Sequence, residues 1–178
     1  SLPAADLVLF INKLAKEYSK KDNRHFVATV GKLDISPNSA TIIPSLAEIL
    51  IDLRVVNKGS RNDFLKNLKN EVKRLSAFYD QKIIFKDIVF SPYVEMSGYV
   101  NELLESSAKK QNFSFMFMDS GAGHDTAHLS KVSPASMIFI PCKDGLSHCP
   151  EEYAETQDIK KGSEVIQQSI LLIKSKIK

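Results

Sequence analysis

The 178-residue sequence has no tryptophan, only two cysteines, and seven residues each of glycine and proline. So few glycines and prolines exclude a collagen-like or low-complexity chain, and 43% hydrophobic with 25% charged residues is an ordinary globular composition. Apolar runs such as 136–141 and 166–173 are far shorter than the ~20 residues of a membrane helix. The net charge of +3 is small and dispersed, so we expect a soluble protein that binds neither nucleic acid nor membrane.

The two cysteines, Cys142 and Cys149, match neither a CxxC redox pair nor a zinc-knuckle spacing. Reduced thiols in a cytoplasmic protein are the simplest interpretation. No basic leader precedes the first apolar stretch, residues 7–10, so the sequence does not predict a signal peptide. Because the chain starts with serine and enters a helical pattern at once, we interpret it as a piece of a longer protein.

Hydrophobic periodicity in the first half predicts two amphipathic helices and three strands. In chain order these are helix 6–18, strand 26–35, strand 49–55, helix 60–78 and strand 83–90. Ser60 is the expected N-cap of the second helix, with Asp63 placed to complete a capping box. The order is that of a ferredoxin-like, split βαβ layout that lacks its opening strand. We therefore expect residues 1–93 to form an antiparallel α+β domain.

The second half, residues 94–178, predicts a different arrangement. A helix capped by Ser97 precedes two short strands, 114–118 and 136–140, which are joined by a glycine-rich loop and a short helix. A β-α-β step of this kind implies parallel strands. A long amphipathic helix around residues 159–173 closes the chain. The expected fold class is α/β overall, with an antiparallel half followed by part of a parallel α/β domain.

Three of the four histidines lie in the second half. His124 and His128 have the spacing of an HExxH zinc helix, but Asp125 stands where that motif has its glutamate base, so a coincidental pair is the better interpretation. His124 and His148 each follow an expected strand, where α/β proteins bind ligands and where metal-assisted chemistry uses histidine. Ordinary loop histidines are the alternative at both positions. His25 is expected at the surface.

Several short motifs follow one another along the chain. The first half contains Thr-Val-Gly-Lys-Leu at 29–33, Ser-Pro-Asn at 36–38, Ile-Ile-Pro at 42–44 and Asp-Leu-Arg at 52–54. The second half contains Ser-Gly-Ala-Gly-His-Asp at 120–125, Met-Ile-Phe-Ile-Pro at 137–141 and Gly-Leu-Ser-His-Cys-Pro-Glu-Glu-Tyr at 145–153. From about Val27 to the C-terminus, this series resembles the metal-dependent amidohydrolases that include N-carbamoyl-L-amino acid hydrolase, allantoate amidohydrolase and β-ureidopropionase.

The resemblance implies a two-domain, homodimeric enzyme with two divalent metal ions, such as zinc, manganese, nickel or cobalt, in each complete active site. Residues 1–93 correspond to the lid domain, which also forms the dimer, and residues 94–178 to the C-terminal part of the catalytic domain. The remaining metal ligands and the general base belong to an N-terminal catalytic portion that this chain lacks. The chain alone is therefore expected to be inactive.

The resemblance also implies roles for single residues. His148 is the expected metal ligand, with Glu151 or Glu152 orienting it, and Arg54 and His124 are the expected catalytic residues. The implied substrate-binding residues are Asn38, Thr41, Arg54, Gly121, Gly123 and His124. Thr41 departs from the family's asparagine and leaves the substrate open. Without the resemblance, Ser-Pro-Asn reads as a turn and Arg54 as a strand-surface charge paired with Asp52 or Glu48.

The expected function is hydrolysis of a linear C–N amide bond in a small molecule, an N-carbamoyl amino acid, allantoate or a ureido acid, by metal-activated water. One alternative is an aminoacylase or dipeptidase of the same metallopeptidase superfamily. The other is a non-catalytic dimerisation module.

Overall fold

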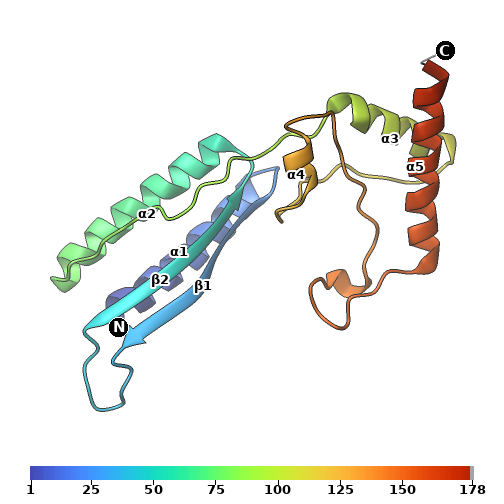
Figure 1. The fold of residues 1–178 in the computed structure, drawn as a ribbon. Coiled ribbons are helices and arrows are strands. Elements are labelled where there is room, and N and C mark those ends of the chain that lie inside the picture. The colour runs from blue at the N-terminus through green and yellow to red at the C-terminus, as the bar shows by residue number, and fades with distance from the viewer. Residues whose placement is uncertain (177–178) are drawn as a thin grey trace. The chain divides into compact units, whose positions relative to one another are not determined.

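The computed structural model describes residues 1–176 and divides the chain into two compact units (Figure 1). The first unit contains Ser1–Tyr93 together with Asp119–Ala122, and the second contains Val94–Met118 and the chain from Gly123 onward. The segment Asp119–Ala122 is therefore separated in sequence from the rest of its own unit.

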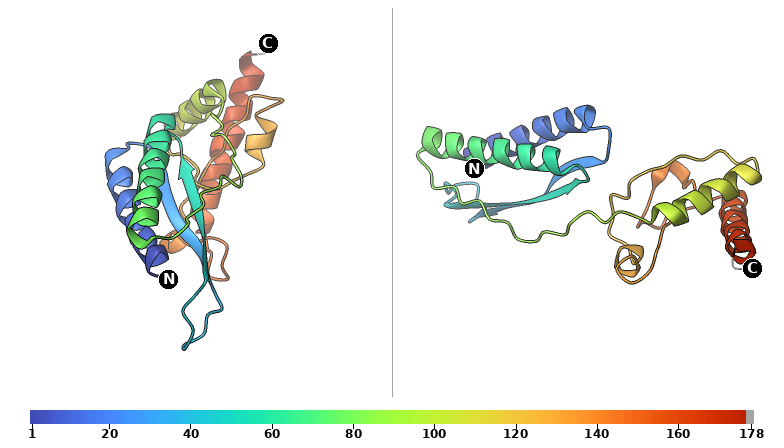
Figure 2. Two further views of the ribbon diagram at one scale, coloured as in Figure 1. Left: turned by 90° about the vertical axis from the view of Figure 1, so that its left-hand side faces the viewer. Right: turned by 90° about the horizontal axis from the view of Figure 1, so that it is seen from above.

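The first unit is a two-stranded antiparallel sheet with two helices on one of its faces (Figure 2). Its elements are α1 (Leu2–Lys21), β1 (Phe26–Ser36), β2 (Leu46–Val55) and α2 (Lys58–Tyr79). This order confirms the helix, strand, strand, helix succession expected from the periodicity. Lys20 and Lys21 lie in the last turn of α1, where positive charge is favourable against the helix dipole.

The register of the sheet fixes where its functional candidates lie. Val27 pairs with Arg54 near one end of the sheet, and Ser36 pairs with Leu46 at the other end. A register shift between Val30 and Lys32 interrupts the ladder. The 37–45 connection is therefore at the opposite end of the sheet from Arg54.

The core of the first unit is formed by one face of each helix against the sheet. Phe64 and Leu75 of α2 have no exposed surface, and Ile11 of α1 is 1% exposed. Phe26, at the start of β1, packs edge-on against Phe64 with ring centroids 5.4 Å apart. These contacts explain why the helical periodicity of the sequence was so regular in this half.

The N-cap of α2 differs from the expected one. Asn57, not Ser60, caps the helix, and its Oδ1 accepts hydrogen bonds from the backbone N–H groups of Gly59 and Ser60 at 2.9 and 3.3 Å. Both residue types are good N-caps, and the helix begins at Lys58 because the chain turns directly after β2. The expected Ser60–Asp63 capping box was wrong.

The segment 83–90, expected as a strand, is not a strand. It runs back along α2, with the Lys69 ammonium 5.4 Å from the Phe85 ring centroid and the Arg61 guanidinium 4.3 Å from that of Phe90. Ile83 packs against the core of the first unit, as Phe85 does. Ile83 and Phe85 thus pack on the first unit, whereas Ile84, Ile88 and Val89 stay largely exposed, and the sheet has two strands.

The second unit contains α3 (Gly98–Lys110), the short α4 (Thr126–Leu129), a 3₁₀ turn (Lys143–Gly145) and α5 (Thr156–Lys176). Ser97 caps α3 as expected, because its hydroxyl accepts from the backbone N–H of Val100 at 3.4 Å. Helices α3 and α5 pack together through the buried hydroxyls of Ser107 and Ser169, which are 2.8 Å apart. Cys142 and Cys149 are free thiols.

The two strands expected in the second unit, 114–118 and 136–140, are not strands in the structure. A strand requires a hydrogen-bonded neighbour, and within residues 1–176 the only ladder is that of β1 with β2. The side chains of Met116 and Phe117 are 79% and 63% exposed. A mixed α/β chain with one antiparallel pair is therefore shown, and the parallel half of the expected fold is not confirmed.

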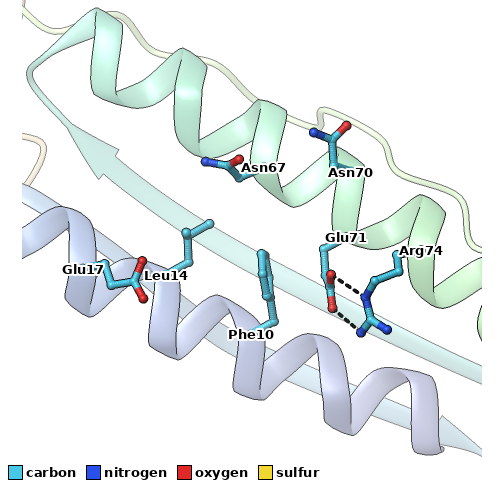
Figure 3. A pocket seen from close by; sticks show the side chains of 7 residues that line it. All are labelled: Phe10, Leu14, Glu17, Asn67, Asn70, Glu71 and Arg74. Carbon is cyan, nitrogen blue, oxygen red and sulfur yellow. Dashed lines mark hydrogen bonds and ion pairs between the residues drawn. The ribbon is translucent and has the colours of Figure 1, made fainter.

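A groove of 430 Å³ lies between α1 and α2 (Figure 3). Its lining residues are Phe10, Leu14, Glu17, Asn67, Asn70, Glu71 and Arg74. Two of them, Glu71 and Arg74, pair with each other across one turn of α2. It contains none of the predicted site residues. In the part of the chain that the structure describes, no helix is long and apolar enough to cross a membrane.

Candidate functional site

Arg54 lies near the end of β2 and makes contacts in two directions. Its Nε and Nη2 donate to Oδ2 of Asp52 at 2.8 and 2.6 Å, as expected for neighbours two positions apart on one face of a strand. Its Nη1 donates to the carbonyl oxygen of Gly121 at 2.8 Å. The hydrogen bond to Asp52 raises the pKa of Arg54 above its ordinary value. The surface pair with Asp52 is therefore real, and Arg54 also binds the glycine-rich loop.

The segment Asp119–Ala122 is held by a second arginine. Arg24 donates from Nη2 to Oδ1 of Asp119 at 2.6 Å and from Nε to Oδ2 at 3.2 Å, and its Nη2 also donates to the Tyr93 hydroxyl at 2.9 Å. The backbone N–H of His25 donates to the same carboxylate at 3.3 Å. Bonding to Arg24 is the main cause that holds the pKa of Asp119 below its usual value.

Gly121 lies directly against the ring of His25. A Cβ at position 121 would come within 2.6 Å of Nε2 and 2.7 Å of Cε1 of His25, so a side chain there requires a shift. His25 is half-buried, with Nε2 enclosed and without a hydrogen-bond partner, so the expectation of a simple surface residue was wrong. No motif or spacing in the sequence indicates that residue 25 contacts the glycine-rich loop.

His124 directly precedes the first turn of α4. Its Nδ1 accepts a hydrogen bond from the backbone N–H of Ala127 at 3.2 Å. In the neutral ring this bond assigns the proton to Nε2, which is then a donor. His128 is exposed and lies within α4, whereas His124 lies before the helix begins, so the two do not share a helical face. This arrangement agrees with a coincidental pair.

His148 has an unusual backbone conformation. Its φ angle is +60°, a left-handed value that costs energy for a residue with a side chain. The Glu152 carboxylate accepts from the backbone N–H of His148 at 2.8 Å. The imidazole is exposed, and Glu151 is exposed beside it. Glu152 thus fixes His148 through the main chain, not through the ring as the sequence suggested.

Asn38 and Thr41 are exposed in the 37–45 connection, and Asn38 has a φ of +48°. About eight residues of β2 separate this connection from Arg54, which corresponds to ~27 Å of strand. A small molecule bound at Arg54 therefore contacts neither residue of the same chain. A Cβ at Gly123 would meet open space, so neighbouring atoms do not restrict that position.

Among residues 1–176, no group of three or more histidine, cysteine, aspartate or glutamate residues is placed to hold a metal ion. The exposed His148 imidazole can supply one nitrogen ligand, and Zn²⁺, Mn²⁺, Ni²⁺ and Co²⁺ all accept imidazole. Its donor chemistry fits a metal site that takes its other ligands from elsewhere.

Comparison with known proteins gives a consistent result. The model of Peptidase family M20/M25/M40 matches residues 8–172. A ureidoglycolate hydrolase from Oryza sativa is 35% identical over 93% of this chain and 34% of its own length. An N-carbamoyl-L-amino-acid amidohydrolase from a Pseudomonas species is 30% identical over 84% of this chain and 36% of its own. A hydantoinase/carbamoylase family amidase from Burkholderia multivorans superposes with a TM-score of 0.85 at 27% identity, over 96% of this chain and 40% of its own.

The family match and the superposition thus place the chain in a known class of mixed α/β proteins. More specifically, the chain belongs to Peptidase family M20/M25/M40. The family resemblance inferred from the motifs is confirmed. The chain spans about a third of the length of the curated relatives that it matches.

Proposed function

We propose that this chain is part of a metal-dependent amidohydrolase that cleaves a linear C–N bond in an N-carbamoyl amino acid, allantoate or a ureido acid. The names of the relatives support the reaction class, since they include N-carbamoyl-L-amino-acid and allantoate amidohydrolases and ureidoglycolate hydrolases. The observation that carries the proposal is the contact of Arg54 with Gly121, two of the predicted substrate-binding residues.

Arg54 is proposed to bind the carboxylate of the substrate or the oxyanion of the transition state. Its guanidinium has five N–H donors, of which Asp52 and Gly121 use three. Two of its donors already bind one carboxylate oxygen, Oδ2 of Asp52, which supports a role in binding a substrate carboxylate. A substrate carboxylate would use the free donors or take the place of Asp52.

His124 is proposed to donate a hydrogen bond from Nε2 to the oxygen on which negative charge develops. The hydrogen bond that its Nδ1 accepts from Ala127 favours the tautomer with the proton on Nε2 and orients the ring, which limits reorganisation during the reaction. Gly123, immediately before it, has room for a substrate to approach the backbone. Asn38 and Thr41 are proposed to contact substrate bound away from Arg54 of their own chain.

His148 is proposed to be a metal ligand, with Glu152 holding its backbone and Glu151 as the other acidic residue that could orient it. The divalent ions, zinc, manganese, nickel or cobalt, would lower the pKa of a bound water and so supply the nucleophile. The other ligands and the general base are proposed to come from a preceding catalytic portion. The chain alone would then lack activity.

The first unit is proposed to be the lid and dimerisation domain of a cytoplasmic homodimer, and the second to be part of the catalytic domain. A two-stranded sheet leaves strand edges available for a two-fold contact. A non-catalytic dimerisation module is the second candidate, because residues 1–176 include no complete metal cluster. An aminoacylase or dipeptidase is the alternative within the family.

The experiment is an activity assay on the longest protein encoded by the reading frame that contains this chain, with each divalent ion added. Substrates are N-carbamoyl amino acids, allantoate and ureidoglycolate, with N-acetyl amino acids and dipeptides as the matched alternatives. Release of ammonia from the first set supports the proposal. Turnover of N-acetyl amino acids or dipeptides alone identifies an aminoacylase or dipeptidase, and inactivity of a metal-loaded dimer supports the module.

A further inference from the structure

The segment Asp119–Ala122 belongs to the first unit although its neighbours in sequence do not. Met118 before it and Gly123 after it both belong to the second unit, whereas the four residues themselves belong to the first. His124 follows two positions after Ala122. The contacts that hold this segment therefore limit how freely the chain can carry His124.

One end of the segment is held by the Asp119 carboxylate. It receives two hydrogen bonds from Arg24 and one from the backbone N–H of His25. The side chain of Asp119 is 16% exposed, so water screens this pair less than an ordinary surface ion pair. Tyr93 adds a hydroxyl acceptor and a ring 5.1 Å from the guanidinium carbon, which fixes the orientation of Arg24.

The middle of the segment is held independently. The Gly121 carbonyl accepts from Arg54, and the absence of a side chain at Gly121 lets the loop lie against the His25 ring. Ser120 closes a local turn, since its hydroxyl accepts from the backbone N–H of Ala122 at 3.2 Å. The segment is therefore held at two points, Asp119 and Gly121, directly before the loop that carries His124.

We infer that Arg24 is a positioning residue that holds Asp119–Ala122 on the first unit through Asp119 and so restricts the loop that carries His124. Its effect on the loop stands on the geometry of the first unit, and only its effect on turnover rests on the proposed function. Arg24 does not touch the reacting groups in this scheme. The competing interpretation is a surface ion pair without consequence for the loop.

The backbone N–H of His25 reports directly on this contact, because its acceptor is Asp119. Hydrogen exchange of that amide should accelerate by ~10-fold or more in Arg24→Ala, since an Asp119 freed from Arg24 no longer stays within bonding distance. The matched control is Arg74→Ala. Arg74 grips Glu71 with the same two-bond geometry, at 2.9 and 2.7 Å, and the Glu71 side chain is 13% exposed.

Two further variants keep the test decisive if Arg24→Ala unfolds the first unit. Arg24→Lys keeps the positive charge but loses the planar guanidinium with its two parallel donors. It should give an intermediate acceleration of hydrogen exchange at the His25 amide. Tyr93→Phe removes one acceptor of Arg24 and should give a smaller one. Amides of α1 and α2 should stay protected in both. If exchange at His25 is no faster in the Arg24 variants than in Arg74→Ala, the inference is wrong.

In the longer, active enzyme, Arg24→Ala should lower kcat at least ~10-fold, with metal content unchanged and KM altered less than about threefold. Arg24→Lys should recover part of kcat. If exchange at the His25 amide is faster but kcat is unchanged, Arg24 is not a positioning residue for the reaction. Lack of activity in the unmodified enzyme would overturn the proposed function, while the exchange result would still decide whether Arg24 restricts the loop.

Discussion

The two units of the molecule differ in how many large apolar side chains they bury. The first encloses Phe64, Leu68 and Leu75 almost completely, whereas the second leaves Met116 and Phe117 largely exposed. The first unit therefore has a core of its own within this chain. The difference indicates that folding stability is concentrated in the α1–α2–sheet layer.

The largest effect expected from this comparison is that of Phe64→Ala. Removing a ring with no exposed surface should destabilise the first unit by about 3–5 kcal/mol, from lost burial and the cavity left behind. Phe117→Ala is the control in the second unit, where the same change at a 63% exposed ring should shift stability by less than about 0.5 kcal/mol. Denaturant unfolding measures both, and equal losses would contradict the contrast.

A change at Arg54 tests whether the first unit also contributes to the reaction. In the longer enzyme, Arg54→Lys should lower kcat/KM by ~10²-fold, because an ammonium cannot reproduce the two-bond grip of a guanidinium. Metal content by elemental analysis should stay the same. Kinetics close to normal would return Arg54 to the role of a surface partner of Asp52.

The histidines of the second unit should separate metal binding from turnover. His148→Ala should lower metal affinity at least as far as the ~10–100-fold loss seen when an outer partner of a ligand is removed, with partial recovery of activity at high metal concentration. His124→Ala should retain its metal and lose turnover. Stoichiometry after gel filtration distinguishes the two, and a reversed result would exchange their roles.

The smallest effect is the pH dependence of the Arg24–Asp119 pair. Because the pKa of Asp119 is lowered in the folded chain, its stabilising contribution is complete above the ordinary aspartate value of about 3.9 and is lost as pH falls through the lowered value. The change should stay below about 1 kcal/mol, because Arg24 is 42% exposed. NMR titration of the Asp119 carboxyl should show a low midpoint that rises in Arg24→Ala and not in Arg74→Ala.

Most of the secondary structure could be predicted from periodicity alone. Helices α1, α2, α3 and α5 and the β1–β2 pair follow from the spacing of apolar residues. Helices α1 and α2 bury the apolar face that this spacing marks, whereas in α5 Ile166 and Ile170 stay 50% and 60% exposed. The segments 83–90, 114–118 and 136–140 have strand-like sequences but no ladder partner in residues 1–176. Strand propensity is local, whereas strand formation depends on a neighbour.

The site shows the same division between local and distant information. The motif residues Arg54, Gly121, His124 and His148 were identified because each lies in a recognisable short pattern. Arg24 was missed because its partner Asp119 is 95 positions away and no motif links the two. Contacts of this kind follow from the tertiary fold and leave no mark in a single sequence.

The contact between Gly121 and His25 links the residue types that two positions, far apart in the sequence, can accept. A Cβ at position 121 would overlap the imidazole of His25, so a side chain there requires the ring or the loop to move. Substituting Gly121 requires a shift of the His25 ring, a smaller residue at 25 or a different loop path. Among related sequences, a larger residue at position 121 should therefore accompany a smaller one at position 25. The residue types at this pair would then indicate whether the loop lies against position 25.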